Sequence, residues 1–156
     1  MRRRHLILSC VSLPFVASAH AHGVRAGELV IDHPYAVPMT AGATDGAAYL
    51  RSVKNRGVLG DRLIGATSPR AASVVLRRRV RGGATAPVQA IDFVELPPGA
   101  ELRLRHDGDV QLALVGVSPP LRDGDRFPLR LRFERAGEVD VTVWVQTPRR
   151  DAGHRH

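Results

Sequence analysis

Histidines near both ends of the chain are the residues best suited, by type and spacing, to hold a metal ion. His20 and His22 stand one residue apart in the segment AHAHG, and His154 and His156 stand one residue apart at the far end. A neutral imidazole nitrogen is a good ligand for copper, nickel and zinc. The sequence therefore indicates two candidate transition-metal sites, one near each end.

The residues before His20 have the pattern of a secretory signal peptide. Three arginines directly after Met1 precede the apolar run LILSCVSLPFVA, and the small-residue triplet ASA follows, ending at Ala19. The apolar run is too short to span a bilayer. We therefore expect a leader over residues 1–19, with cleavage after Ala21 as the alternative, and a periplasmic or secreted protein that does not span the membrane.

Cys10 is the only cysteine and lies inside this leader. The exported domain therefore has neither a disulfide nor a thiolate ligand. The segment Leu8-Ser9-Cys10 also resembles a lipoprotein signal, although attachment at Cys10 would leave its apolar region unusually short.

The cleavage site decides what the first histidine pair can do. Cleavage after Ala19 would place His22 third, where the free amine, two backbone amide nitrogens and the imidazole form the square-planar nitrogen set that Cu(II) and Ni(II) prefer. Cleavage after Ala21 would make His22 the first residue, whose amine and ring chelate copper as a pair. The alternative is that these histidines are accidental composition. For His154 and His156 the alternative is a solvated tail that binds metal only weakly.

Alternating arginines indicate a second kind of chemistry. On a strand, Arg77, Arg79 and Arg81 would project from one face while Leu76 and Val80 face the other way. A guanidinium stripe can bind a carboxylate, a phosphate or an acidic patch on another exported protein through forked hydrogen bonds. The alternative is an edge strand kept soluble by its charge.

Known catalytic patterns are missing from the sequence. It has no His-Glu-x-x-His segment, no glycine-rich phosphate loop and, once exported, no cysteine nucleophile. The recurring acids, Asp107 with Asp109 and Asp123 with Asp125, flank glycines and are typical of turns. An isolated Asp-x-Asp pair does not make a calcium site. We therefore predict that the protein is not an enzyme.

Length and charge limit the number of domains and the kinds of binding partner. Removal of the leader leaves 156 − 19 = 137 residues, enough for one domain with a single core. The leader contains three arginines and no acid, so 23 basic against 15 acidic residues becomes 20 against 15, a net charge of +5. Such a charge favours acidic partners and anionic surfaces. Nucleic acid is not expected, because aromatic residues make up only 4% of the chain, too few for base stacking.

Apolar and polar residues alternate with period two along most of the chain, as in Leu129, Leu131 and Phe133 against Arg130 and Arg132. We predict strands at 28–33, 47–54, 61–67, 73–81, 88–94, 100–105, 109–116, 127–134 and 138–146, with turn signals between them. Many short strands at this spacing favour a single antiparallel Greek-key β-sandwich, an all-β fold. Residues 148–156 are predicted to form a disordered polar tail.

Five segments resemble the periplasmic PCu(A)C copper chaperones. They are IDHPY at 31–35, GAAYL at 46–50, DRL at 61–63, LPPG at 96–99 and PLRDGD at 120–125. The resemblance extends over most of the exported chain, and we delimit the domain at 24–147. It implies a cupredoxin-like fold and delivery of copper to an extracytoplasmic cytochrome oxidase centre.

The resemblance also implies four copper ligands that this chain does not carry. In the family these are a His or Met, then a Met, then a His-x-Met pair, and by spacing they fall on Arg78, Gln89, Gln111 and Ala113. Cu(I) needs thioether or imidazole donors, whereas a guanidinium has no free lone pair and repels the cation. We therefore expect that the family site does not form.

Three other residues are not expected to replace that site. His106, beside Asp107 and Gly108, is predicted to be a solvated turn histidine. His33 is predicted to be a structural histidine, hydrogen-bonded at a strand end. Met39 is the only methionine beyond the leader, and one thioether supports no site.

Two functions follow from these residues. The first is an exported copper chaperone that works with a cytochrome oxidase assembly partner and holds copper at the terminal histidines. The alternative is a binding module without metal, which recognises an acidic partner or an anion through the alternating arginines.

Overall fold

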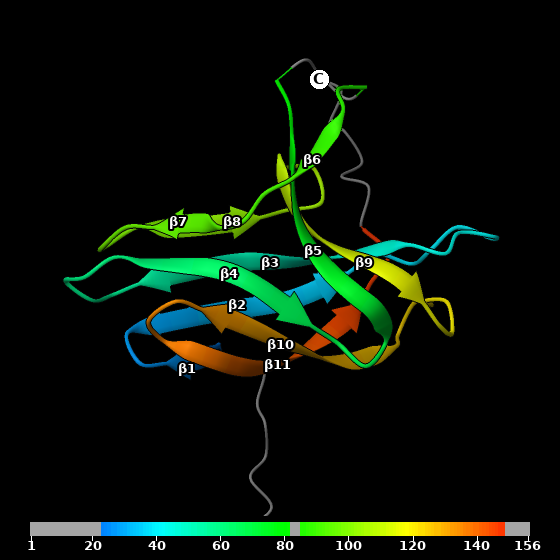
Figure 1. The fold of residues 1–156 in the computed structure, drawn as a ribbon. Coiled ribbons are helices and arrows are strands. Elements are labelled where there is room, and N and C mark those ends of the chain that lie inside the picture. Colours follow the sequence, from blue (N-terminus) through cyan, green and yellow to red (C-terminus); the bar gives the residue numbers. More distant parts are fainter. Residues whose placement is uncertain (1–22, 82–84, 149–156) are drawn as a thin grey trace, which may run out of the picture.

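The computed structural model describes residues 23–81 and 85–148, which form an all-β domain of eleven strands (Figure 1). The strands are β1 (Val24–Ala26), β2 (Leu29–Ala36), β3 (Gly46–Asn55), β4 (Asp61–Thr67), β5 (Ala71–Arg79), β6 (Val88–Ala90), β7 (Val94–Leu96), β8 (Glu101–Leu104), β9 (Val110–Val117), β10 (Arg126–Phe133) and β11 (Gly137–Val145). The described residues contain no helix that is long and apolar enough to cross a membrane.

The main sheet closes on itself. Its strands follow the order β1-β2-β11-β10-β4-β5-β9-β3-β8, and β2 also pairs with β3. The circuit from β2 through β11, β10, β4, β5, β9 and β3 therefore returns to β2. All pairs are antiparallel except that of β2 with β11. Closure leaves few free edges, which is one way an all-β domain avoids edge-to-edge association.

The core lies inside this closed sheet, and the period-two pattern explains it. Along β10 every second residue is buried, beginning with Phe127 and ending with Phe133, while the arginines between them are exposed. The valines of β11 alternate in the same way. Burying each such apolar side chain contributes about 1.5–3 kcal/mol. The predicted all-β class and Greek-key strand arrangement are confirmed.

Two stretches differ from the sequence-based prediction. The single strand expected at 88–94 is two short strands, and these pair with different neighbours, β6 with β5 and β7 with β4. The chain crosses from one neighbour to the other at Ile91, Asp92 and Phe93, where the adjacent apolar pairs Ala90-Ile91 and Phe93-Val94 interrupt the alternation. The short strand β1 also escaped prediction, because three residues are too few to show a period.

Figure 1 shows β6 and the adjoining end of β5 extending away from the rest of the sheet. The part of β5 that carries the arginines pairs there with β6 on one side and with β9 on the other. The arginine-bearing strand is therefore not an edge strand, which argues against the interpretation of its charge as edge protection.

Candidate functional site

The strand positions that the resemblance assigns to copper lie on β5, β6 and β9. Arg77 is in register with Gln111 on β9, and Val75 is in register with Ala113. Paired residues on adjacent strands project to the same side of a sheet, and side chains alternate along each strand. Arg77, Gln111 and Ala113 therefore share one face, which we call the outer strand face.

Arg78 and Gln89 lie on the opposite side. They pair with each other across β5 and β6, on the side of the buried Leu76 and Leu112. The four positions reached by family spacing thus do not converge. A site shared with Gln111 would use Arg77 instead of Arg78. Register therefore replaces Arg78 by Arg77 as the β5 residue that shares a face with Gln111.

This correction does not restore a copper site, because the outer strand face still lacks suitable donors. Arginine, glutamine and alanine offer neither a thioether nor an imidazole to Cu(I). Nor do residues 23–81 and 85–148 contain any group of three or more His, Cys, Asp or Glu that could hold a metal ion. The outer strand face therefore does not fit copper.

The alternating arginines only partly follow the predicted pattern. Arg77 and Arg79 share the outer strand face and are half-buried. Arg81 is exposed, but β5 ends at Arg79, so the alternation that assigned Arg81 to this face stops before it. For the same reason Val80 is 37% exposed instead of packing inward beside Leu76.

The outer strand face continues onto β3 through Tyr49. Ala47 pairs with Ala113, and Tyr49 lies two residues further along the same side. Burial raises the pKa of the Tyr49 phenol above its ordinary value of 10.0, and the neighbouring Tyr35 raises it further, while the positive charge of Arg79 lowers it. The guanidinium of Arg79 therefore lies close enough to this phenol to act on it electrostatically.

His106 packs against Tyr35 and Tyr49, and we call these three residues the tyrosine cluster. His106 is exposed and lies in the turn after β8, as predicted, yet its backbone N–H donates a 3.2 Å hydrogen bond to the Tyr35 hydroxyl. That hydroxyl also lies 3.3 Å from Nδ1 of the His106 ring. The ring packs edge-on against Tyr35 and Tyr49, at centroid distances of 6.3 and 6.2 Å. His106 is thus fixed in place by two tyrosines.

His33 has the hydrogen-bond partner that was predicted, but not the predicted position. Its Nε2 lies 3.1 Å from Nε2 of Gln146. Instead of ending a strand, it lies within β2 with a φ of 43°. The backbone of a residue other than glycine rarely adopts this left-handed conformation, and at His33 it marks a kink in the strand.

Of the remaining candidate metal ligands, Met39 lies within the described residues and the terminal histidines lie outside them. Met39 is half-buried, and its Sδ accepts a 3.5 Å hydrogen bond from the backbone N–H of Leu121. Its thioether therefore has a structural role. The terminal histidines lie outside the described residues, so the copper sites proposed for His20, His22, His154 and His156 stay predictions.

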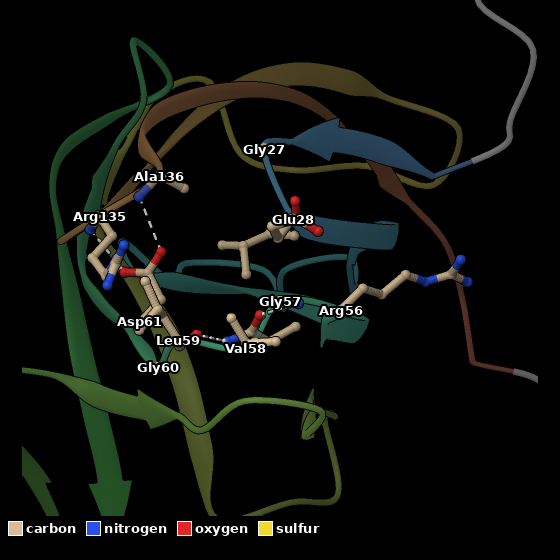
Figure 2. A pocket seen from close by; sticks show the side chains of 12 residues that line it. Gly27, Glu28, Arg56, Gly57, Val58, Leu59, Gly60, Asp61, Arg135 and Ala136 are labelled. Carbon is tan, nitrogen blue, oxygen red and sulfur yellow. Dashed lines mark hydrogen bonds between the residues drawn. The ribbon is translucent and has the colours of Figure 1, made fainter.

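A hollow of about 440 Å³ lies at the turn between β3 and β4 (Figure 2). Its polar side chains hold neighbouring loops. Asn55 Nδ2 donates to the carbonyl oxygens of Leu59 at 2.8 Å and Leu96 at 3.1 Å, and the Asp61 carboxylate accepts from the backbone N–H groups of Arg135 and Ala136. This hollow is therefore a structural feature of the turn.

The described strands can now be compared with known proteins. Residues 29–145 match the LpqE-like lipoprotein family, a range that runs from the first residue of β2 to the last residue of β11. The chain belongs to the LpqE-like family. No curated protein matches it by sequence.

Solved structures relate this LpqE-like chain to PCuAC domains. The apo PmoF2 PCuAC domain is 30% identical with a TM-score of 0.65, over 86% of this chain and 100% of that one. The copper-bound PCuAC domain from PmoF2 is 29% identical with a TM-score of 0.68, over 81% and 99%. Apo-DR1885 from Deinococcus radiodurans, 21% identical with a TM-score of 0.60 over 94% and 97%, shares the fold. The resemblance to PCu(A)C proteins and the cupredoxin-like fold are confirmed.

The sequence predicts that this LpqE-like protein lacks the family's copper donors, but it did not reveal the packing of Tyr35 and Tyr49 against His106. Tyr35 and Tyr49 stand in the segments IDHPY and GAAYL, which were noticed for their resemblance only. The only sign of their position in the sequence was that both tyrosines lie among apolar residues, in the segments that form β2 and β3. Their contact with His106, 71 residues from Tyr35, needs the sheet topology.

Proposed function

We propose that the protein is an extracytoplasmic copper carrier of the PCuAC type whose metal is held by histidines near its ends. One observation carries this proposal. The chain has the fold of a copper-bound PCuAC domain, while the outer strand face holds Arg77, Gln111 and Ala113 and no copper donor. The leader and the lipoprotein family both support an extracytoplasmic location.

Terminal histidines supply the donors that the strands lack. With cleavage after Ala19, the amine, two amide nitrogens and the ring of His22 favour Cu(II), and with cleavage after Ala21 the amine and ring of His22 form a smaller chelate. His154 and His156 add two imidazoles. Lipid attachment at Cys10 would instead remove the free amine near His22, leaving only side-chain donors.

The role that fits such a carrier is binding and transfer of copper without catalysis. The recipient that the family resemblance supports is an extracytoplasmic cytochrome oxidase centre or its assembly partner.

A competition titration tests the site. The exported protein, with its amino terminus fixed by intact mass, is titrated with Cu(I) and Cu(II) against a chelator. We expect stoichiometric binding that falls at least about tenfold in His20→Ala/His22→Ala, a loss of about 1.4 kcal/mol. His154→Ala/His156→Ala should lose less. Unchanged affinity in the variant lacking all four histidines would refute the terminal site.

A second candidate function is favoured by the half-buried arginines of the outer strand face. Arg77 and Arg79 share this face beside Tyr49, and such guanidinium groups bind carboxylates through forked hydrogen bonds. We propose that the face recognises an acidic partner or an anion, with Arg81 adding charge. Capture of exported proteins by the chain should then be abolished in Arg77→Gln/Arg79→Gln/Arg81→Gln. Equal capture by the wild type and this variant would exclude the role.

A further inference from the structure

A larger hollow, of about 890 Å³, lies over β2, β3 and β8 and reaches the residues after β11. We call it the basic groove. Its charged lining consists of four cations and two acids, Arg51, Lys54, Arg103, Arg105, Asp32 and Glu101. The charged lining therefore has a net charge of 4 − 2 = +2. None of the arginines that line the groove belongs to the outer strand face. The groove also does not depend on the proposed copper site.

Two backbone irregularities at the same level of the sheet build this groove. On β2 the kink at His33 lies between residues paired with Ser52 and Leu50 of β3. On β3 the register with β8 shifts between Leu50 and Val53. Such irregularities bend strands and redirect side chains. The bend leaves Arg51 exposed above the groove while Leu50 and Val53 remain in the core.

The arginines of the groove are held only loosely by the protein's own acids. Arg51 lies 4.0 Å from Asp32, Arg103 lies 3.1 Å from Glu101, and Arg105 lies 3.6 Å from Asp107. The three arginine side chains are 72%, 60% and 56% exposed. Exposed pairs of this kind are worth about 0–1 kcal/mol each. An incoming carboxylate can therefore replace the internal acid at little cost.

The spacing of the cations suits an extended chain better than a single small anion. Arg103 on β8 and Arg105 just after its end are both exposed, and both line the groove. Residues two apart on a strand are about 7 Å apart, which equals the spacing of alternate side chains in an extended peptide. A phosphate ion would need these cations to converge on one point.

We propose that the basic groove binds an extended acidic segment of another exported protein, with acidic residues at alternate positions. The carboxylates lie against Arg51, Arg103 and Arg105. The backbone of the segment runs along β8, whose only strand partner among the described residues is β3. Charge complementarity carries this assignment and also predicts an affinity that falls with salt.

Trp144 gives a direct readout of binding. It is the only tryptophan of the chain, is 42% exposed, and is in register with Tyr35, which lines the groove. Gln146, two residues further along the chain, also lines the groove. Occupation of the groove should therefore change the fluorescence of Trp144.

The test titrates the exported protein with capped synthetic peptides at low and high salt. One probe alternates glutamate with threonine, a second has the same composition with its glutamates consecutive, and a third has glutamine for glutamate. We expect the alternating peptide to bind best and the glutamine peptide not to bind. In Arg51→Gln/Arg103→Gln/Arg105→Gln the affinity should fall at least about tenfold. The corresponding lysine variant should keep most of the affinity, which separates loss of charge from loss of fold.

A matched control removes the same charge elsewhere. Arg25, Arg56 and Arg122 are exposed and lie outside the groove lining, so the triple change to glutamine there should alter affinity by less than about twofold. Equal losses in both triple variants would overturn the proposal, since net charge alone would explain them. Loss only in Arg77→Gln/Arg79→Gln would assign the peptide to the outer strand face instead. Binding of inorganic phosphate or of phosphatidylglycerol vesicles through the groove arginines, without peptide binding, would also overturn it.

Discussion

At the scale of single residues, Asp61 shows how one carboxylate joins distant segments. It is 7% exposed and accepts hydrogen bonds from the backbone N–H groups of Arg62 and Arg135 at 2.8 Å and of Ala136 at 3.0 Å. These bonds fix the start of β4 against the turn between β10 and β11. Hydrogen bonds to a charged acceptor are stronger than those between neutral groups.

Replacement of this carboxylate should therefore destabilise the fold. In Asp61→Ala three backbone donors lose their acceptor, and we expect the free energy of unfolding to fall by about 2–3 kcal/mol. Urea denaturation of the exported protein measures this. Asp92→Ala, at an exposed position, is the control and should change stability by less than about 0.5 kcal/mol. Similar losses in both variants would contradict the assigned role of Asp61.

Tyr49 predicts a pH dependence in the alkaline range. Its pKa is raised above 10.0, mainly by burial, so the fold favours the neutral phenol. The stability that this preference contributes is fully present below about pH 10 and is lost as the pH rises through the folded-state pKa. In Tyr49→Phe the free energy of unfolding should fall less steeply above about pH 10. Identical slopes for the two proteins in urea titrations would show that Tyr49 does not cause the dependence.

The chemistry of single positions was partly predictable from the sequence. Gln111 and Ala113 were predicted to stand in place of copper ligands, because a short spacing within one strand is read directly from the chain. The role of Asp61 was not predictable, since its two distant partners lie 74 and 75 residues away and depend on turn geometry.

At the scale of elements, strand register decides which residues can share a site. Alternation along β10 and β11 was strong enough to predict both strands and their buried faces. Pairing partners were not predictable, because alternation within a strand carries no information about its neighbours. Counting back by the family spacing reaches Arg78, whereas register places Arg77 beside Gln111.

The register predicts where a copper site can be installed. In a background without terminal histidines, Arg77→Met, Gln111→His and Ala113→Met together should create Cu(I) binding, since all three share the outer strand face. The matched set with Arg78→Met in place of Arg77→Met should bind far more weakly. A Cu(I) competition titration compares the two, with circular dichroism confirming that both fold. Equal affinities would contradict the assignment of faces.

At the scale of the whole molecule, the closed sheet provides a scaffold on which several surfaces remain available. The inner face is filled by the apolar core, so function is restricted to outer faces, turns and chain ends. The outer strand face carries arginine and glutamine, and the basic groove lies over β2, β3 and β8. Our proposal assigns copper to the terminal segments, because the outer strand face carries none of the donors that Cu(I) prefers.

X-ray absorption spectroscopy of the copper-loaded exported protein tests that claim most directly, because it identifies the donor atoms. We expect a shell of nitrogen or oxygen donors with imidazole scattering, and no sulfur, since the only thioether in residues 20–156, that of Met39, is held by Leu121. The signal should disappear when His20, His22, His154 and His156 are replaced by alanine. A sulfur shell, or an unchanged spectrum in that variant, would contradict the terminal site.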